Sequence, residues 1–390
     1  MTAPRFSDRL PPQASANAIA LEVAGLRSAG VPFADLTASD PTTAGLSYPA
    51  DLLAGLADPG GLIYQPQPRG RYAARAAVAR DCARRGAVVD PEQVILSAST
   101  SEAYSWLFKL LCNPGERVLV PRPSYPLFEH LTRLEGIETS PYDLEYHGRW
   151  AIDFARVESA PADTRAVLVV SPNNPTGSYI ARREWARLSA MARARGWAII
   201  VDEVFADYPL EADDTPTDLA AAADVLTFTL GGASKSLGLP QVKLGWMVVG
   251  GPDGARHAAL DALELIADSF LSVGTPVQVA AAGLLARAAA IREQIHDRVR
   301  HNLAWARTAV AAHPACEMLR ADGGWTAIVR IPATRGEEAF VLDLLRRERV
   351  LVHPGYFFDL PHEAYVVVSL LPPAAVFADA FARMLRLADA

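Results

Sequence analysis

A lysine in a glycine-rich loop is the residue of this sequence best placed for covalent chemistry. Lys235 lies in Gly231-Gly-Ala-Ser-Lys-Ser-Leu-Gly-Leu-Pro240, directly after an apolar run. A lysine partly withdrawn from water loses its proton readily and becomes a nucleophile for an aldehyde. The chain has 37 Lys plus Arg but only three lysines, Lys109, Lys235 and Lys243, so a lysine here is informative. Taken alone, a solvated loop lysine remains the better interpretation.

A carboxylate and an amide follow two other apolar runs. Asp202 ends Trp197-Ala-Ile-Ile-Val-Asp202. An ionised Asp beside a pyridine nitrogen keeps that nitrogen protonated, so that the ring withdraws electrons from a substrate carbon. Asn174 lies in Ser171-Pro-Asn-Asn-Pro-Thr-Gly177, where Pro and Gly fix the path of the chain and its amide can donate to a ring oxygen. A cap at a strand end and an ordinary Asx-Pro turn are the simpler roles.

An anion site and an aromatic surface complete the set. The segment Ser97-Ala-Ser-Thr-Ser-Glu102 lies between a predicted strand and a predicted helix, where backbone amides and hydroxyls suit a phosphate. A plain Ser/Thr helix cap is far commoner. Tyr125, in Pro121-Arg-Pro-Ser-Tyr-Pro, offers a face on which a flat ring can stack, or it is a core tyrosine.

These residues follow strands of a predicted α/β domain. Between residues 94 and 249, short β-branched runs alternate with helical patterns, which predicts a parallel sheet with crossover helices. Several runs are apolar throughout, as in strands covered on both faces. Doubly wound sheets bind ligands at the carboxyl ends of such strands. The predicted strands are residues 94–96, 117–120, 166–170, 197–201, 225–230 and 244–249.

The length of 390 residues favours two domains. We expect residues 1–45 to form an N-terminal segment packing on the small domain, residues 46–275 the large domain, and residues 276–390 an interdomain helix and a small α+β domain. An Ala-rich stretch after Thr275-Pro276, reaching about residue 312, predicts one long helix. Beyond it, the predicted strands are 327–331, 350–352 and 365–370, and the predicted helices are 337–348 and 374–387.

Composition narrows the class of partner. With 51% apolar residues, 21% charged residues and a net charge of -7, the chain is globular and lacks the basic character that nucleic-acid binding requires. No apolar run approaches the roughly 20 residues needed to span a bilayer, and the opening residues do not form a signal peptide, so we expect a cytoplasmic protein. Three widely separated cysteines, Cys82, Cys112 and Cys316, indicate core thiols and no metal site.

The motifs, taken together and in this order, resemble the fold type I (class I/II) pyridoxal-phosphate-dependent aminotransferases over nearly the whole chain. The N-P-T-G peptide, the D-E-x-[YF] strand end and the S-K-x-x-G-L-P loop are all intact. The resemblance implies an α/β fold, with a mostly parallel sheet sandwiched by helices and a smaller α+β domain. It also implies pyridoxal 5'-phosphate held as a Schiff base on Lys235, and amino transfer between an amine or amino acid and a carbonyl acceptor.

The same resemblance assigns the other residues of the site. Asp202 would meet the pyridine nitrogen and Asn174 the ring oxygen, while Tyr125 would stack on the ring. The phosphate would be held by Ser99, Thr100, Ser101 and Lys243, the last standing where many members have an arginine. Tyr64, in Tyr64-Gln-Pro-Gln-Pro-Arg-Gly70, looks like the tyrosine that reaches the phosphate of a neighbouring subunit, which implies a homodimer with shared active sites.

The departures from the family fall mainly on the substrate side. Phe205 replaces a tyrosine that meets the ring oxygen in many members. Val367 stands where the family usually has the arginine that grips the substrate α-carboxylate, and no arginine occurs from residue 350 to 382. Either another arginine takes over, with Arg69 and Arg71 as candidates, or the substrate has no α-carboxylate.

Other functions fit the sequence less well. A lyase, decarboxylase or cyclase on the same scaffold is the first alternative, because the cofactor only supplies an electron sink. A non-catalytic ligand sensor is disfavoured because no DNA-binding module precedes the sheet domain. A nicotinamide enzyme is disfavoured because Gly250-Gly-Pro-Asp-Gly254 lacks the G-x-G-x-x-G spacing.

Overall fold

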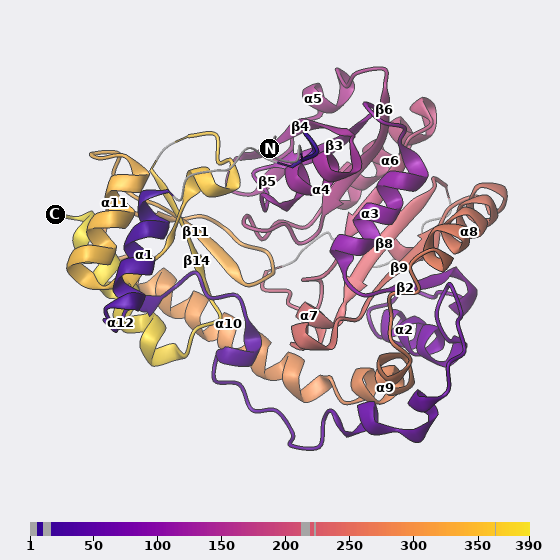
Figure 1. Ribbon diagram of the computed structural model, residues 1–390. Helices are drawn as coiled ribbons and strands as arrows, with labels where there is room; N and C mark the ends of the chain where they lie inside the picture. The colour runs from indigo at the N-terminus through magenta and orange to yellow at the C-terminus, as the bar shows by residue number, and fades with distance from the viewer. Residues whose placement is uncertain (1–5, 11–16, 212–218, 222–223, 363) are drawn as a thin grey trace, which may run out of the picture.

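Two sheets and the helices around them organise the chain. The computed structural model describes residues 6–10, 17–211, 219–221, 224–362 and 364–390. Figure 1 shows the larger sheet on one side of the molecule and the smaller sheet, with its own helices, on the other. In spatial order the larger sheet contains β2 (Val94–Ser97), β9 (Gly245–Gly250), β8 (Thr227–Gly232), β7 (Ala198–Asp202), β6 (Thr164–Val170), β3 (Arg117–Arg122), β4 (Glu138–Tyr146) and β5 (Trp150–Ile152).

The direction of the strands confirms a mostly parallel sheet. The pairs from β8 through β4 are parallel, whereas β9 runs antiparallel to both of its neighbours and β5 is antiparallel to β4. Our expectation of crossovers throughout residues 94–249 was therefore wrong for β9. Only a short helix, α7 (Ala233–Ser236), and a 3-10 turn separate β8 from β9, and a parallel return needs a connection of a dozen or more residues, usually helical.

Helices cover both faces of the larger sheet, which explains its apolar strands. In β6 and β7, alternate residues belong to two different cores, such as Ala166 and Ile200 on one face and Val167 and Ile199 on the other. No face is therefore left for polar side chains. The helices of this part are α2 (Tyr72–Arg84), α3 (Thr100–Leu111), α4 (Leu127–Glu135), α5 (Phe154–Glu158), α6 (Arg182–Arg195), α8 (Asp253–Asp268) and α9 (Thr275–Ala286).

The long helix predicted after Thr275 is in fact two helices. Helix α9 ends at Ala286, and α10 (Ala289–Val310) continues after a break at Arg287 and Ala288. Arg287 donates to the backbone and the carboxylate of Asp51, at 3.2 and 2.5 Å, so a distant segment holds the break. Within the described residues, no helix combines the length and the hydropathy that crossing a membrane would require.

The smaller sheet is antiparallel and carries the C-terminal half of the site. Its order is β10 (Glu317–Met318), β11 (Thr326–Arg330), β14 (Tyr365–Ser369) and β13 (His353–Pro354). The N-terminal part of the chain joins this side, because β1 (Ala34–Asp35) pairs with β12 (Val350–Leu351). The surrounding helices are α1 (Ala18–Ser28), α11 (Glu337–Asp343), extended by a π turn to Glu348, and α12 (Ala374–Ala388).

Candidate active site

A cavity of about 230 Å³ opens where the carboxyl ends of the larger sheet's strands face the smaller sheet. Five of the cofactor-binding residues assigned from the sequence line it: Thr100, Tyr125, Asn174, Asp202 and Lys235. Each follows or ends a strand of the larger sheet, so the parallel arrangement brings together residues far apart in sequence. The rest of the lining consists of Thr37, Ser39, Tyr104, Ser124, Leu127, Phe128, Val170, Val204, Phe205, Trp325, Thr326, His353, Phe358, Val367 and Ser369.

Lys235 projects into this cavity from α7. Its Nζ atom donates to the carbonyl oxygen of Ser39 at 3.4 Å and lies 4.9 Å from the ring centre of Trp325 and 5.5 Å from that of Phe205. Burial lowers the pKa of Lys235, although the negative charges of Asp40 and Asp202 act in the opposite direction. The amine is therefore more easily deprotonated than an exposed lysine, as a nucleophile for an aldehyde must be.

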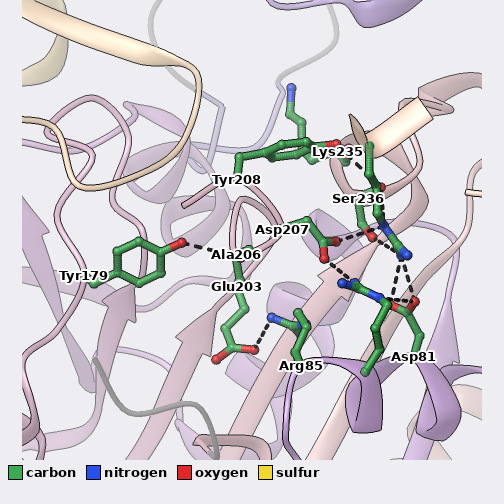
Figure 2. Close-up of polar contacts among 11 residues, drawn as sticks. Asp81, Arg85, Tyr179, Glu203, Ala206, Asp207, Tyr208, Lys235 and Ser236 are labelled. Carbon is green, nitrogen blue, oxygen red and sulfur yellow. Dashed lines mark hydrogen bonds and ion pairs between the residues drawn. The ribbon is translucent and has the colours of Figure 1, made fainter. Parts of the chain in front are cut away.

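A hydrogen bond from Tyr208 and a buried ion-pair network around Arg292 hold the backbone of α7 in place. Tyr208 donates its hydroxyl to the carbonyl oxygen of Lys235 at 2.7 Å, and Arg292 donates to the carbonyl oxygen of Ser236 at 3.0 Å. Arg292 also contacts Asp81 at 2.8 Å and Asp207 at 3.3 Å. Figure 2 shows these contacts on one side of Lys235 and its amine pointing away from them. The network thus fixes the main chain and leaves the amine available.

Asp202 lies buried at the end of β7 with two hydrogen-bond donors. The Tyr104 hydroxyl donates to Oδ2 at 2.7 Å, and the backbone N–H of Val204 donates to Oδ1 at 3.0 Å. Burial raises the pKa of Asp202, and these two hydrogen bonds oppose the rise. A buried carboxylate in such a place favours a cationic partner, such as a protonated ring nitrogen.

Unpartnered polar atoms lie beside this carboxylate. Asn174 Oδ1 and Ser124 Oγ are buried and have no hydrogen-bond partner among the described residues. Both residues line the cavity, as does Tyr125, whose side chain is about half exposed. Polar atoms left in this way indicate a place for a ligand with polar groups. An amine, a carboxylate, an amide and an aromatic ring together fit a pyridine aldehyde.

The predicted phosphate-binding segment forms the beginning of α3. Ser99 is the N-cap and accepts from the Glu102 N–H at 3.1 Å, so its side chain is used as a helix cap in this structure. Gly245 allows β9 to pass close by, because a Cβ there would lie 2.9 Å from the Ser99 carbonyl carbon. Thr100 reaches the cavity, whereas Ser99, Ser101 and the exposed Lys243 do not line it.

Tyr64, Arg69 and Arg71 lie outside the cavity. Tyr64 is 76% exposed and lines a separate surface depression together with Leu271. Arg69 is paired within its own chain, at 3.2 Å from Asp261 and 2.6 Å from Glu264. The Arg71 backbone N–H donates to Gln278 at 2.7 Å. Within one chain neither arginine lines the cavity beside Val367.

The match to a known family agrees with this arrangement. Residues 40–374 match the family described as aminotransferase class I and II. The chain belongs to that family. It is therefore a pyridoxal-phosphate-dependent aminotransferase, a transferase of nitrogenous groups that acts on small molecules.

Relatives with curated names and solved structures agree with this identification. The aminotransferase is 26% identical over 327 residues to the glutamate-pyruvate aminotransferase AlaA of Haemophilus influenzae, covering 82% of this chain and 81% of that protein. It is 28% identical over 305 residues to the alanine aminotransferase of Mycobacterium tuberculosis, covering 76% and 70%. In fold it is similar to an alanine aminotransferase from Pyrococcus furiosus, with a TM-score of 0.88, 22% identity and coverage of 98% and 99%.

Several lining residues of the aminotransferase were not found by sequence reasoning. Tyr104 follows Thr100 by one helical turn, so both lie on the same face of α3. This i, i+4 spacing in the sequence could have indicated that Tyr104 reaches the cavity as Thr100 does. Trp325 and His353 come from the smaller sheet, more than 80 residues after Lys235. Nothing near them in sequence indicates chemistry, because only the packing of the two sheets brings them to the cavity.

Proposed function

We propose that Lys235 is the amine that holds pyridoxal phosphate as a Schiff base, and that amino transfer takes place in the cavity between the two sheets. The observation that supports this most strongly is the common cavity of the Lys235 amine, the Asp202 carboxylate and the Asn174 amide. When bound, the cofactor supplies an aldehyde and an electron-withdrawing ring. The neutral Nζ of Lys235 then accepts a proton from the amine-bearing carbon of the substrate.

The other residues orient the ring and the phosphate. In this proposal Asp202 keeps the ring nitrogen protonated, Asn174 donates to the ring oxygen and Tyr125 stacks on the ring. Ser99, Thr100 and Ser101 bind the phosphate through the beginning of α3, where backbone N–H groups and the helix dipole attract an anion. Lys243 lies two residues before β9, the strand whose Gly245 passes close to Ser99, and it adds a point charge near the beginning of α3.

We further propose a homodimer with shared active sites. Leu62, Ile63, Tyr64 and Leu271, which we call the exposed apolar cluster, are 87%, 60%, 76% and 37% exposed. Tyr64 and Leu271 line the same depression. Apolar side chains gathered on one surface are typical of an interface. Tyr64 would extend from this cluster towards the phosphate of the second subunit.

Borohydride reduction tests the assignment of the lysine. Protein loaded with pyridoxal phosphate, reduced and digested should carry the cofactor mass on the peptide that contains Lys235. We expect Lys235→Ala to lose all turnover above background, because the nucleophile and the base are the same atom. Lys109→Ala is the matched control. Lys109 lies on α3 and pairs with Glu135 of α4 at the surface, so this variant should keep the activity of the wild type. Reduction that labels Lys109 or Lys243 instead of Lys235 would refute the proposal.

A further inference from the structure

One wall of the cavity carries no charge at neutral pH. The wall that we call the small-sheet wall comes from the smaller sheet and the N-terminal segment, and His353 is its one ionisable side chain among the described residues. Burial lowers the pKa of His353 to about 4, against the opposing effect of Asp35, so the imidazole is neutral at pH 7. The small-sheet wall consists of Thr37, Ser39, Trp325, Thr326, His353, Phe358, Val367 and Ser369.

The centre of this wall is fixed by packing. His353 and Val367 are cross-strand partners on β13 and β14, and Val367 is fully buried. The His353 ring stacks on Phe357 with 4.8 Å between ring centres and an interplanar angle of 7°. Phe358 packs edge-on against the same imidazole at 5.4 Å. A neutral ring and an aliphatic side chain therefore line the cavity in a defined position.

Two hydroxyl groups of the wall already donate hydrogen bonds within the protein. Thr37 donates to Asp35 at 2.5 Å, and Thr326 donates to the carbonyl oxygen of Pro175 at 3.0 Å. Trp325 Nε1 is a buried donor without a hydrogen-bond partner among the described residues. The small-sheet wall thus offers apolar surface and neutral polar groups, among them the buried Trp325 N–H, and a buried donor without a partner favours a ligand with an acceptor.

Apart from the Lys235 amine, which the proposed function engages with the cofactor, the charged groups that act on the wall and on Lys235 are carboxylates. Asp35 lies close enough to act on His353, and Asp40 close enough to act on Lys235. The arginine candidate Arg69 is neutralised by Asp261 and Glu264. A carboxylate placed against this wall would lose its hydration, and with the Lys235 amine engaged by the cofactor it would gain no cation from the wall and would approach Asp35 and Asp40.

We propose that the preferred amine substrate has no carboxylate on the carbon that bears its amino group, and that the rest of it is uncharged, largely apolar and contains a hydrogen-bond acceptor. This inference rests on the proposed function, which places the substrate beside Lys235. The amine carbon is oxidised by two electrons to a carbonyl, and its nitrogen and those electrons go to the aldehyde carbon of the cofactor. Water released when the substrate amine condenses with the aldehyde would be taken up again when the C=N bond to the substrate carbon is hydrolysed.

Matched pairs of donors test the proposal on the wild-type holoenzyme. Each pair consists of an L-amino acid and the amine that lacks only its carboxylate: phenylalanine and phenethylamine, leucine and isoamylamine, and tyrosine and tyramine. The absorbance of the bound cofactor reports a single half-reaction without a second substrate. We expect each amine to convert the cofactor at least about tenfold faster, at equal concentration, than its amino acid.

Binding of inert analogues gives a second readout. By calorimetry on the holoenzyme, 3-phenylpropanol should bind at least about tenfold more tightly than 3-phenylpropionate at pH 7. The variant Val367→Arg should narrow or reverse this preference, whereas Val367→Leu, which adds bulk without charge, should retain it. Because the wild-type comparison needs no variant, the test stands even if Val367→Arg fails to fold.

Two outcomes would overturn the inference. One is faster conversion by the L-amino acids than by the amines; if that preference for amino acids then depends on Arg69 or Arg71, the partner subunit supplies a cation. The other is a loaded cofactor that neither the amines nor the L-amino acids convert. A protein that does not load cofactor on Lys235 instead refutes the proposed function, so the two failures are distinguishable.

Discussion

Asp202 combines two opposing influences on one carboxylate. Burial favours its protonated form, whereas the Tyr104 hydroxyl and the Val204 N–H stabilise the ionised form. Since burial has the larger effect on the pKa, a cationic partner would stabilise the ionised form of Asp202 in the cofactor-free protein. If Asp202 meets the protonated ring nitrogen, as proposed, part of the free energy lost on burying this carboxylate would be recovered when the cofactor binds.

The pH dependence of stability follows from this raised pKa. A carboxyl group whose pKa is raised by folding contributes stability that is present below about pH 4 and is lost as the pH rises through the folded-state pKa. We expect cofactor-free Asp202→Asn to exceed the wild type in unfolding free energy at pH 7, and this advantage should shrink as the pH falls below about 4. Denaturant unfolding across pH 3–8 measures this. Parallel profiles for the two proteins would contradict it, and Asp224→Asn, at an exposed site, is the control.

Tyr104 should tune the same carboxylate. Without its hydroxyl, the ionised form of Asp202 loses a short hydrogen bond, so we expect Tyr104→Phe to weaken cofactor binding about tenfold, or about 1.4 kcal/mol. A fluorescence titration with pyridoxal phosphate measures the dissociation constant. Tyr142→Phe is the matched control, because Tyr142 is equally buried but donates to Leu168 away from the cavity. Equal effects of both variants would argue against a specific role for Tyr104.

Residues that follow a strand were predictable, and those placed by packing between sheets were not. Lys235, Asp202, Asn174 and Tyr125 follow or end apolar runs, and the topology of a parallel sheet brings such positions to one edge. His353 shares no local pattern with them. Its role depends on the register that sets it opposite Val367, which involves two strands more than ten residues apart.

At the scale of elements, α7 depends on contacts from three other segments. It has four residues, too few to be stable alone, and it carries the reactive lysine. Burial by itself would raise the pKa of Asp207, but Arg292, Arg85 and Arg84 outweigh this effect and keep the pKa low. The carboxylate therefore stays ionised and anchors Arg292, whose guanidinium binds the backbone of α7.

Removal of Arg292 should destabilise the whole protein. Arg292→Met leaves Asp81 and Asp207 short of a buried partner, and we expect a loss of about 3–5 kcal/mol in unfolding free energy. Chemical denaturation measures the loss. Arg287→Met, five residues earlier and paired with Asp51 on the surface, should change stability little. A similar small effect at Arg292 would mean that the buried pairs do not hold α7.

Element boundaries were predicted well where apolar runs were uniform. They were predicted poorly where the composition of an element is untypical or where contacts distant in sequence lie at the boundary. Strand β4 contains Pro141 and several polar residues, so it does not have the composition of a strand, and it was not predicted. The break between α9 and α10 contains neither Gly nor Pro. Arg287, at the break, contacts Asp51, more than 200 residues away, and no local propensity indicates the break.

At the scale of the whole molecule, the exposed apolar cluster predicts the assembly. We expect a mass of two chains, each of 41.8 kDa, by analytical ultracentrifugation. The double variant Leu62→Asp/Ile63→Asp should shift the protein towards monomer and weaken cofactor binding, because Tyr64 would no longer reach a second subunit. Val88→Asp, at an equally exposed apolar residue outside the cluster, should remain dimeric. A monomeric wild type with full cofactor affinity would contradict the shared-site arrangement.

The loop around Asn174 is fastened directly to the smaller sheet. The carbonyl oxygen of Gly177 accepts from the N–H groups of Asp322 and Gly323 at 3.1 and 2.8 Å, and Thr326 binds the Pro175 carbonyl. A side chain at Gly177 would collide with the Gly323 carbonyl oxygen, so this junction tolerates little change. By contrast, His353 and Val367 pair only within their own sheet. Substitutions at positions 353 and 367 therefore leave these hydrogen bonds at the Asn174 loop in place, although Val367 is buried in a core that it shares with Val169 and Ile199.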